Sequence, residues 1–213
     1  MKYKSRTPNP EPLYPKNMDD TIRQHKALIR ETMLALRDAL DPDERAAKSL
    51  LIKSNLFSLP EIMSASSLMF YVSFRSEVQT EPMIRHALSL GKQVIVPLTD
   101  MKNKRLLLSQ LKDFDEDLAP GIWGILEPKP EKIRPVEYSD VDIVVTPGAA
   151  FSEKGWRIGY GGGFYDRLLR ESQKKAYALS FEMQIISGDI PHNPERDVPV
   201  DYIVTEKRVI VCR

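Results

Sequence analysis

The stretch that decides the fold runs from residue 67 to residue 98 and reads SLMFYVSFRSEVQTEPMIRHALSLGKQVIVPL. It opens with Ser67–Phe74, a short apolar run with aromatic residues, which predicts a buried strand. Thr80 then caps a predicted helix that Gly91 ends, and Gln93–Leu98 is the next predicted strand. Strand, helix and strand within about thirty residues form a βαβ unit, which implies a parallel sheet.

Two helices are predicted before this unit. In the first, apolar residues recur at the spacing of one helical face: Ile22, Ile29, Met33, Leu36 and Leu40. The second begins at Asp41-Pro42-Asp43-Glu44, where Asp41 is the expected N-cap and Pro42 takes the first helical position, at which its missing N–H costs nothing. We expect this helix to run to about Leu59.

Further elements are predicted after the unit. The expected strands and helix are Leu106–Leu111, Asp142–Thr146, a helix from Phe164 to about Ser172, Tyr177–Phe181, Tyr202–Thr205 and Val209–Cys212. We therefore expect an α/β fold with a single domain over residues 19–213, in which a mostly parallel central sheet is flanked by helices on both faces. Residues 1–18 are proline-rich and lack hydrophobic periodicity, so we expect a flexible extension there.

Composition argues against several classes of protein. The 213 residues include 31 Lys and Arg against 30 Asp and Glu, so a net charge of +1 gives no case for a nucleic-acid partner. The longest uncharged stretch, Ile62–Phe74, is too short to span a bilayer, and no membrane partner is expected. The single cysteine, Cys212, excludes an intramolecular disulfide, and only three histidines accompany it, which argues against a zinc site. We expect a cytoplasmic protein that is a monomer or a weak homodimer.

The clustering of glycines marks the first candidate for a functional site. None occurs in the first 90 residues, whereas six of the ten fall between Gly148 and Gly163. The segment from Thr146 to Arg167 reads TPGAAFSEKGWRIGYGGGFYDR and matches neither the P-loop nor the dinucleotide fingerprint. Its small residues can still expose backbone N–H groups next to a helix N-terminus, which is a site for phosphate oxygens. The alternative is a glycine-rich surface turn with a helix cap.

Two side chains in this segment add to the phosphate interpretation. Arg157 stands just upstream of the glycines, where we expect a mobile cation. Asp166 falls in the first turn of the predicted helix, where a carboxylate can serve as a cap, a metal ligand or both.

The segment resembles the hallmark of the 5-formyltetrahydrofolate cyclo-ligases, also called methenyltetrahydrofolate synthetases. That hallmark is Pro-Gly, then Phe-Asp, then Gly-x-Arg-Leu-Gly-x-Gly-x-Gly-Tyr-Tyr-Asp, and here it is carried by Pro147-Gly148, Phe151-Ser152 and Gly155–Asp166. Ser152, Ile158 and Phe164 depart from it, and Phe164 removes one hydroxyl near the substrate. The resemblance extends to the Lys26/Arg30 helix, Ser73–Thr80, Gly124–Pro128 and Asp197–Asp201.

The resemblance implies an ATP-dependent ligase. Such an enzyme converts 5-formyltetrahydrofolate to 5,10-methenyltetrahydrofolate through a phosphorylated formyl intermediate, with release of ADP and phosphate. Phosphoryl transfer of this kind needs positioning and charge neutralisation rather than a protein nucleophile, which suits a chain without a Ser-His-Asp or Cys-His signature. Mg²⁺ with ATP as co-substrate is the expected cofactor, and reduced folate and ATP are the expected small-molecule partners.

The resemblance also assigns the nucleotide contacts. Lys26, Arg30 and Arg37 lie within about 40° on one helix face, a stripe that could equally be a solvated flank. With the resemblance, the expected ATP-binding residues are Lys26, Arg30, Arg157, Gly159, Gly161, Gly162, Gly163 and Tyr165. Arg157 and Tyr165 are the expected catalytic pair. Asp166 and Asp197 are the expected metal ligands, with Asp201 in reserve, although Asp197 could be an ordinary loop carboxylate.

The folate is expected at the carboxyl end of the first strand. Glu77 follows that strand, and its carboxylate can accept two hydrogen bonds from the pterin ring N–H and amine, although most such residues are simply exposed. Phe74, Tyr160 and Phe164 could supply flat apolar walls, Phe74 could equally be core, and Trp123 could line the same pocket.

Two other functions compete with the ligase. A sugar-phosphate isomerase on a similar fold could also use a glycine-rich phosphate loop, and a non-catalytic folate- or nucleotide-binding relative would bind without turnover.

Overall fold

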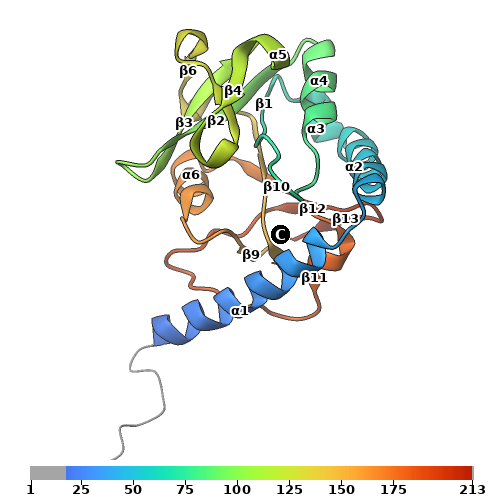
Figure 1. The fold of residues 1–213 in the computed structure, drawn as a ribbon, viewed down its shortest axis with the longest axis vertical. Coiled ribbons are helices and arrows are strands. Elements are labelled where there is room, and N and C mark those ends of the chain that lie inside the picture. The colour runs from blue at the N-terminus through green and yellow to red at the C-terminus, as the bar shows by residue number, and fades with distance from the viewer. Residues whose placement is uncertain (1–17, 213) are drawn as a thin grey trace, which may run out of the picture.

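An eight-stranded sheet forms the centre of residues 18–212, the part of the chain that the computed structural model describes (Figure 1). Its strands in spatial order are β13 (Val209–Val211), β12 (Tyr202–Val204), β10 (Lys175–Leu179), β7 (Ile143–Thr146), β1 (Ser67–Met69), β2 (Gln93–Asp100), β3 (Arg105–Leu111) and β6 (Pro135–Val136). The five strands from β12 to β2 run parallel to one another. At the edges, β13 pairs antiparallel with β12, β3 pairs antiparallel with β2, and β6 pairs antiparallel with β3. The predicted α/β fold with a mostly parallel sheet is confirmed.

Helices cover both faces of this sheet, as predicted (Figure 1). The helices α2 (Pro42–Phe57), α3 (Pro60–Ser64) and α4 (Glu81–Ser89) pack on one face, and α6 (Phe164–Ser172) packs on the other. Alternation along the strands separates the two cores, because Ile143 and Val145 face the first set of helices whereas Val144 faces α6. Both faces are therefore buried, which explains the continuous apolar runs in the sequence.

The first strand of the βαβ unit is shorter than predicted. The sequence predicts a strand over Ser67–Phe74, but β1 ends at Met69. Phe70, Tyr71 and Val72 continue as buried, irregular chain, with only the Phe70 N–H still bonded to the carbonyl of Ile95. The apolar run thus reflects burial rather than strand pairing.

Two predicted helix starts have different outcomes. Asp41 caps α2 as predicted, because its side chain accepts hydrogen bonds from the N–H groups of Asp43 and Glu44. Thr80 precedes α4, but its hydroxyl accepts from the N–H of Ser73 instead of capping the helix. The second helix ends at Phe57 rather than near Leu59.

The first helix, α1 (Met18–Asp38), lies across the loops at one end of the sheet (Figure 1). Ile29 and Met33 pack on a small sheet formed by β8 (Ala150–Ser152), β9 (Arg157–Ile158) and β11 (Ile185–Ile186). The predicted apolar stripe is only partly correct, because Leu36 is exposed. Arg37, which belongs to the basic stripe that could have been a solvated flank, is by contrast only 3% exposed.

The remaining elements lie mainly between β3 and β7. They are α5 (Phe114–Asp117), β4 (Leu118–Pro120), β5 (Leu126–Pro128) and the 3₁₀ turns η1 (Ile122–Gly124), η2 (Pro130–Lys132), η3 (Tyr138–Asp140) and η4 (Glu182–Gln184). The prediction for residues 1–18 falls, apart from Met18, outside the described residues. Within residues 18–212, no helix combines the length and the apolar character needed to cross a bilayer.

Candidate active site

A pocket of about 1030 Å³ opens at the carboxyl ends of the parallel strands. The chain leaves β1 toward β2 but leaves β7 toward β10, so the strand order reverses between β1 and β7. Residues that follow these two strands, among them Tyr71, Glu77 and Pro147, line the pocket. Ligands bind at such a reversal in open α/β sheets.

Apart from the reserve metal ligand Asp201, every residue that the sequence predicts for nucleotide, folate or metal lines this one pocket: Lys26, Arg30, Phe74, Glu77, Arg157, Gly159, Tyr160, Gly161, Gly162, Gly163, Phe164, Tyr165, Asp166 and Asp197. Trp123 lines it too, from the turn between β4 and β5. Segments from five regions of the chain thus meet in a single cavity.

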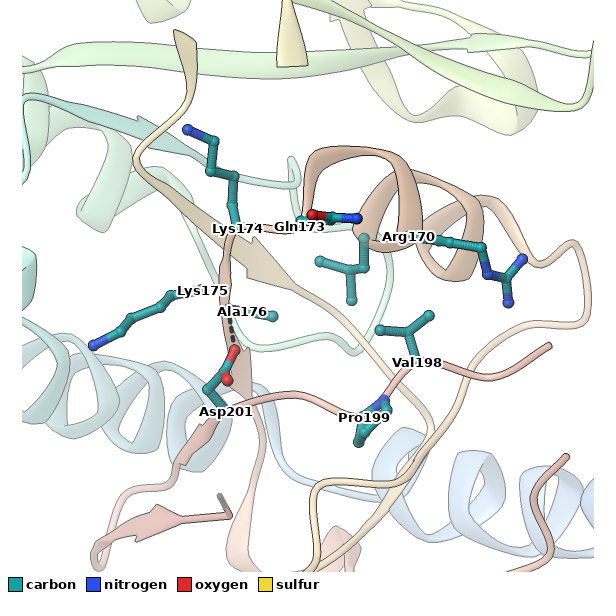
Figure 2. Close-up of a pocket in the computed structure, with 9 residues that line it drawn as sticks. Arg170, Gln173, Lys174, Lys175, Ala176, Val198, Pro199 and Asp201 are labelled. Atoms are coloured by element: carbon teal, nitrogen blue, oxygen red, sulfur yellow. Dashed lines mark hydrogen bonds between the residues drawn. The ribbon is translucent and has the colours of Figure 1, made fainter. Parts of the chain in front are cut away.

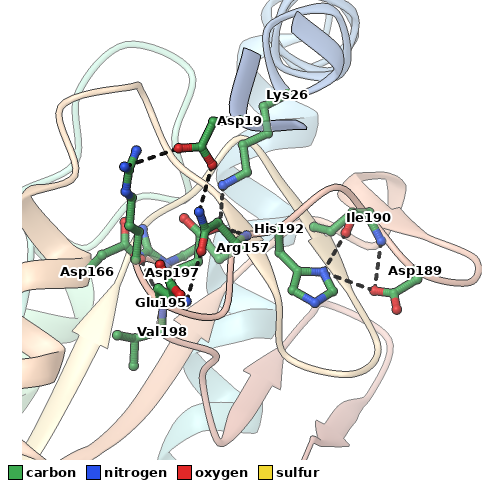
Figure 3. A network of polar contacts seen from close by, with 12 residues as sticks. Asp19, Lys26, Arg157, Asp166, Asp189, Ile190, His192, Glu195, Asp197 and Val198 are labelled. Atoms are coloured by element: carbon green, nitrogen blue, oxygen red, sulfur yellow. Dashed lines mark hydrogen bonds and ion pairs between the residues drawn. The ribbon is translucent and has the colours of Figure 1, made fainter. Parts of the chain in front are cut away.

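The cations of α1 contact the far side of the pocket. Lys26 Nζ lies 2.5 Å from Asp197 Oδ2 (Figure 3). Arg30 Nε donates to the carbonyl of Gly159 at 2.6 Å. Burial lowers the pKa of Arg30, although a guanidinium keeps its charge. The basic face of α1 therefore points into the protein rather than into solvent.

Arg157 is buried, which corrects the expectation of a mobile cation. Its Nη2 lies 3.0 Å from Asp166 Oδ1, and its Nη1 lies 3.5 Å from the carbonyl of Pro147. Asp166 Oδ1 also accepts from the N–H of Val198 (Figure 3). The arginine is thus held in one position at the floor of the pocket, as a preorganised charge.

The glycine loop presents unused amides. Gly161 and Gly163 have φ values of 100° and 64°, in the left-handed region that other residues avoid. Among the hydrogen bonds of the described residues, none uses the N–H of Gly161, Gly162 or Gly163 as donor. Gly163 directly precedes α6, so these N–H groups stand at a helix N-terminus and suit an anion.

Glu77 is the buried carboxylate of the pocket. It is 7% exposed, its Oε2 accepts from the N–H of Phe74 at 2.9 Å, and its Oε1 accepts from the hydroxyl of Tyr160. Burial raises the pKa of Glu77, and the hydrogen bonds from Tyr160 and Phe74 and the charge of Arg37 only partly offset this rise. Such a carboxylate binds strongly to a ligand that brings its own N–H donors.

Comparisons with known proteins agree with the motif. The model of the 5-formyltetrahydrofolate cyclo-ligase family matches residues 22–206. The chain belongs to this family. A mitochondrial 5-formyltetrahydrofolate cyclo-ligase of Arabidopsis thaliana is 31% identical, over 90% of this chain and 77% of that protein. A probable 5-formyltetrahydrofolate cyclo-ligase of Caenorhabditis elegans is 30% identical, over 89% and 97%.

Solved structures give the same result for this cyclo-ligase family member. The NMR structure of 5,10-methenyltetrahydrofolate synthetase from Aquifex aeolicus superposes with a TM-score of 0.78 at 32% identity, over 88% of this chain and 93% of that chain. The corresponding protein of Mycoplasma pneumoniae, at 18% identity and a TM-score of 0.67, shows the shared fold. The family, the enzyme class and the family reaction expected from the sequence are therefore confirmed.

Tyr165 stands beside the buried arginine of this cyclo-ligase family member. The guanidinium of Arg157 lies 5.7 Å from the centre of its ring. Burial, followed by the negative charge of Glu77, raises the pKa of Tyr165, so its hydroxyl stays protonated at neutral pH and can donate a hydrogen bond.

The two expected metal ligands have oxygens to offer. In the described residues, the hydrogen bonds and ion pairs of Asp166 all use Oδ1, and those of Asp197 all use Oδ2. Two carboxylate oxygens beside phosphate-binding groups are the donors that Mg²⁺ takes when phosphates and waters complete its shell. Residues 18–212 contain no cluster of three His, Cys, Asp or Glu side chains that could hold a metal by themselves.

Asp201, the reserve metal ligand, lies elsewhere. It lines a separate cavity of about 370 Å³ beside the end of α6, where its Oδ2 accepts from the N–H of Ala176 at 2.8 Å (Figure 2). This hydrogen bond connects β10 to the segment before β12, so Asp201 has a structural role there.

The sequence missed a second layer of polar residues. Asn193 donates its backbone N–H to Asp197 and its side-chain amide to Asp19, and Arg196 pairs with Asp19 at 3.1 Å (Figure 3). These contacts join the start of α1 to a loop more than 170 positions away in the chain. No local sequence pattern predicts such a contact. Arg37 was noted in the basic stripe, but its contact with Tyr160 was not predicted.

Proposed function

We propose that this chain converts 5-formyltetrahydrofolate to 5,10-methenyltetrahydrofolate with hydrolysis of ATP to ADP and phosphate, in the pocket that joins α1, the glycine loop and Glu77. The observation that carries the proposal is the meeting, in one cavity, of unused loop amides, three cations and a buried carboxylate. The first two suit a triphosphate, and the third suits a pterin.

The triphosphate lies against the glycine loop in this proposal. The N–H groups of Gly161–Gly163 donate to its oxygens, and Lys26, Arg30 and Arg157 neutralise its charge. Arg30 holds the loop through Nε only, so its terminal amino groups can turn to the ligand. Tyr165 adds a hydroxyl donor, and its position beside Arg157 supports a contact with the transferred phosphoryl group.

Asp166 and Asp197 would hold the Mg²⁺ that accompanies ATP. The ion would neutralise charge that develops on the phosphate oxygens when bound. Each carboxylate is already paired with a cation, Asp166 with Arg157 and Asp197 with Lys26. These pairs place negative ligands for the metal directly beside positive contacts for the phosphates.

In this proposal, the pterin ring of the folate binds to the carboxylate of Glu77. A carboxylate with two oxygens matches the adjacent N–H and amine donors of the pterin edge, and its burial excludes water from the pair. Phe74, Tyr160 and Phe164 flank the same cavity and offer ring faces. This arrangement would fix the formyl group relative to the γ-phosphoryl group.

The reaction needs two bond exchanges. The formyl oxygen attacks the γ-phosphorus, and the bond to the leaving oxygen of ADP breaks. The bridge amine then attacks the activated formyl carbon, loses its proton, and the carbon–oxygen bond breaks to release phosphate. The contribution of the protein is positioning and charge neutralisation, to which Arg157 adds a charge already fixed in place.

One mixing experiment tests the proposal. Purified protein, MgATP and 5-formyltetrahydrofolate should give the absorbance rise of the methenyl product, and omission of ATP should abolish it. Binding of both ligands without any product would instead identify a non-catalytic relative. Binding of a sugar phosphate with indifference to ATP would favour the isomerase.

We propose further that the enzyme is cytoplasmic, monomeric or weakly dimeric, and acts on these small molecules without a nucleic-acid or membrane partner. The balanced charge supports this proposal, while the Arabidopsis relative is named as mitochondrial. Sedimentation of the purified protein tests the oligomeric state.

A further inference from the structure

Arg37 is the starting point, because its charge is buried without a carboxylate at ion-pair distance among the described residues. Its Nε donates to Ser76 Oγ at 3.0 Å, and its Nη1 donates to the carbonyl of Gly148 at 3.3 Å and to the hydroxyl of Tyr160 at 2.9 Å. A guanidinium cannot release its proton, so a buried one needs compensation from its neighbours.

That compensation comes through two hydroxyls. Ser76 Oγ accepts from Arg37 and donates to the carboxylate of Asp38, and Tyr160 forms the second chain, toward the pocket. Its hydroxyl accepts from Arg37 and donates to Glu77, which orders three groups as guanidinium, hydroxyl and carboxylate. Each hydrogen bond in such a chain polarises the next, so the charge of Arg37 reaches Glu77 through the hydroxyl. The guanidinium also lies 5.8 Å from the centre of the Tyr160 ring.

Tyr160 is at the same time part of the glycine loop, between Gly159 and Gly161. Arg30 holds the carbonyl of Gly159, and Arg37, seven residues later on the same face of α1, holds the Tyr160 hydroxyl. The Tyr160 side chain therefore connects the glycine loop, which presents amides to the nucleotide, with Glu77, the carboxylate that faces the folate.

We propose that the Tyr160 hydroxyl is a positioning group that couples the two substrate sites: seating of the glycine loop on a triphosphate fixes Glu77 for the pterin, and the pterin in turn fixes the loop. This inference rests on the proposed function and assigns Tyr160 a role beyond that of an apolar wall. Coupling of this kind is reciprocal, so each ligand raises the affinity for the other by the same factor.

The test measures that factor by titration calorimetry. The non-hydrolysable nucleotide AMP-PNP with Mg²⁺ is titrated into the full chain, with and without saturating 5-formyltetrahydrofolate. We expect the folate to raise nucleotide affinity by about tenfold in the wild-type protein. In Tyr160→Phe, which keeps the ring and removes only the hydroxyl, the factor should fall below about twofold.

Tyr138→Phe is the matched control. Its hydroxyl also donates a hydrogen bond, to the carbonyl of Leu106, but it lies outside the active-site pocket. It should keep the wild-type factor, and thermal unfolding should show both variants folded.

Each other outcome has a definite meaning. A factor that persists in Tyr160→Phe overturns the inference, as do independent binding in the wild-type protein and an equal loss in Tyr138→Phe. In those cases both ligands still bind and the proposed function stands. A wild-type protein that binds neither ligand overturns the proposed function, and the inference with it.

Discussion

The two halves of the pocket hold their charges differently. On the nucleotide side, each cation already contacts an oxygen of the protein: Lys26 contacts Asp197, Arg157 contacts Asp166 and Arg30 contacts the carbonyl of Gly159. On the folate side, Glu77 is a single buried negative charge that reaches its cation only through Tyr160.

This difference predicts how each half responds to change. Where several paired cations bind one ligand, the loss of one cation leaves the other cations in place. A lone buried charge has no substitute, and a buried hydrogen-bonding group left without its partner costs its full desolvation. Single substitutions should therefore damage the folate side more than the nucleotide side.

Glu77→Gln should give the largest effect. The amide keeps the shape of the side chain, but it loses the charge and turns a donor toward the donors of the pterin. Calorimetry should show folate affinity reduced at least about thirtyfold and AMP-PNP affinity reduced less than about threefold.

Glu127→Gln serves as its control. Glu127 lines the same pocket, but its Oε1 accepts from the N–H of Thr99. Its folate affinity should change less than about threefold. Equal losses of both ligands in Glu77→Gln would contradict the pterin assignment.

Arg157→Ala should follow in size. The loss of one fixed positive charge at the phosphoryl group should slow formation of the methenyl product at least about tenfold at saturating substrates. Arg85→Ala is the control, because it removes a comparable arginine–carboxylate pair, with Asp115, from the surface. An unchanged rate in Arg157→Ala at both limiting and saturating ATP would remove Arg157 from the mechanism.

Much of this contrast could be predicted from the sequence. The strand–helix–strand unit fixes the parallel sheet, and the rule that ligands bind at the carboxyl ends places Glu77 and the glycine loop at one edge. The motif supplies Arg157 and Asp166, and the wider family resemblance supplies Lys26, Arg30 and Asp197. These features are visible because each depends on residues close together in the chain or on a fold-level rule.

The connections between the halves could not be predicted. Tyr160 OH meets Arg37 over 123 positions and Glu77 over 83, and no spacing rule links such residues. Helical periodicity even favours an exposed Arg37, since cations usually lie on the solvated flank. The buried state of Arg157 could not be predicted either, because its partner Asp166 lies on a different element, α6, and the contact depends on how β9 packs against that helix.

Asp197→Asn separates metal binding from phosphate binding on the nucleotide side. The amide is a poorer ligand for Mg²⁺, and it leaves Lys26 without its counter-charge, so the lysine attracts a phosphate more strongly. The Mg²⁺ concentration for half-maximal rate should rise about fivefold to tenfold, while affinity for metal-free AMP-PNP should not fall. Asp201→Asn, in its separate cavity, should leave the Mg²⁺ requirement unchanged, and an equal shift in both variants would argue against Asp197 as the ligand.

The smallest expected effect is a pH dependence confined to the folate side. Burial raises the pKa of Glu77, and only the ionised carboxylate accepts both pterin hydrogen bonds, so folate affinity should fall as the pH falls through this raised pKa. The tyrosines that face it do not titrate in that range, because burial raises the pKa values of Tyr71, Tyr160 and Tyr165 further above their ordinary alkaline value. The affinity should drop severalfold as the pH is lowered from neutral toward 4.5, the ordinary pKa of a glutamate.

Calorimetry at several pH values checks this prediction, with Glu77→Gln as the variant that should show a flat profile. Tyr160→Phe gives a second check. In the native protein the hydrogen bond from Tyr160 lowers the pKa of Glu77, so its removal should move the fall in folate affinity to higher pH. AMP-PNP binding should not share that displacement, since its contacts on the nucleotide side do not include Glu77. A displacement of equal size for both ligands would mean that the two halves titrate together, and the contrast between paired and lone charges would then be wrong.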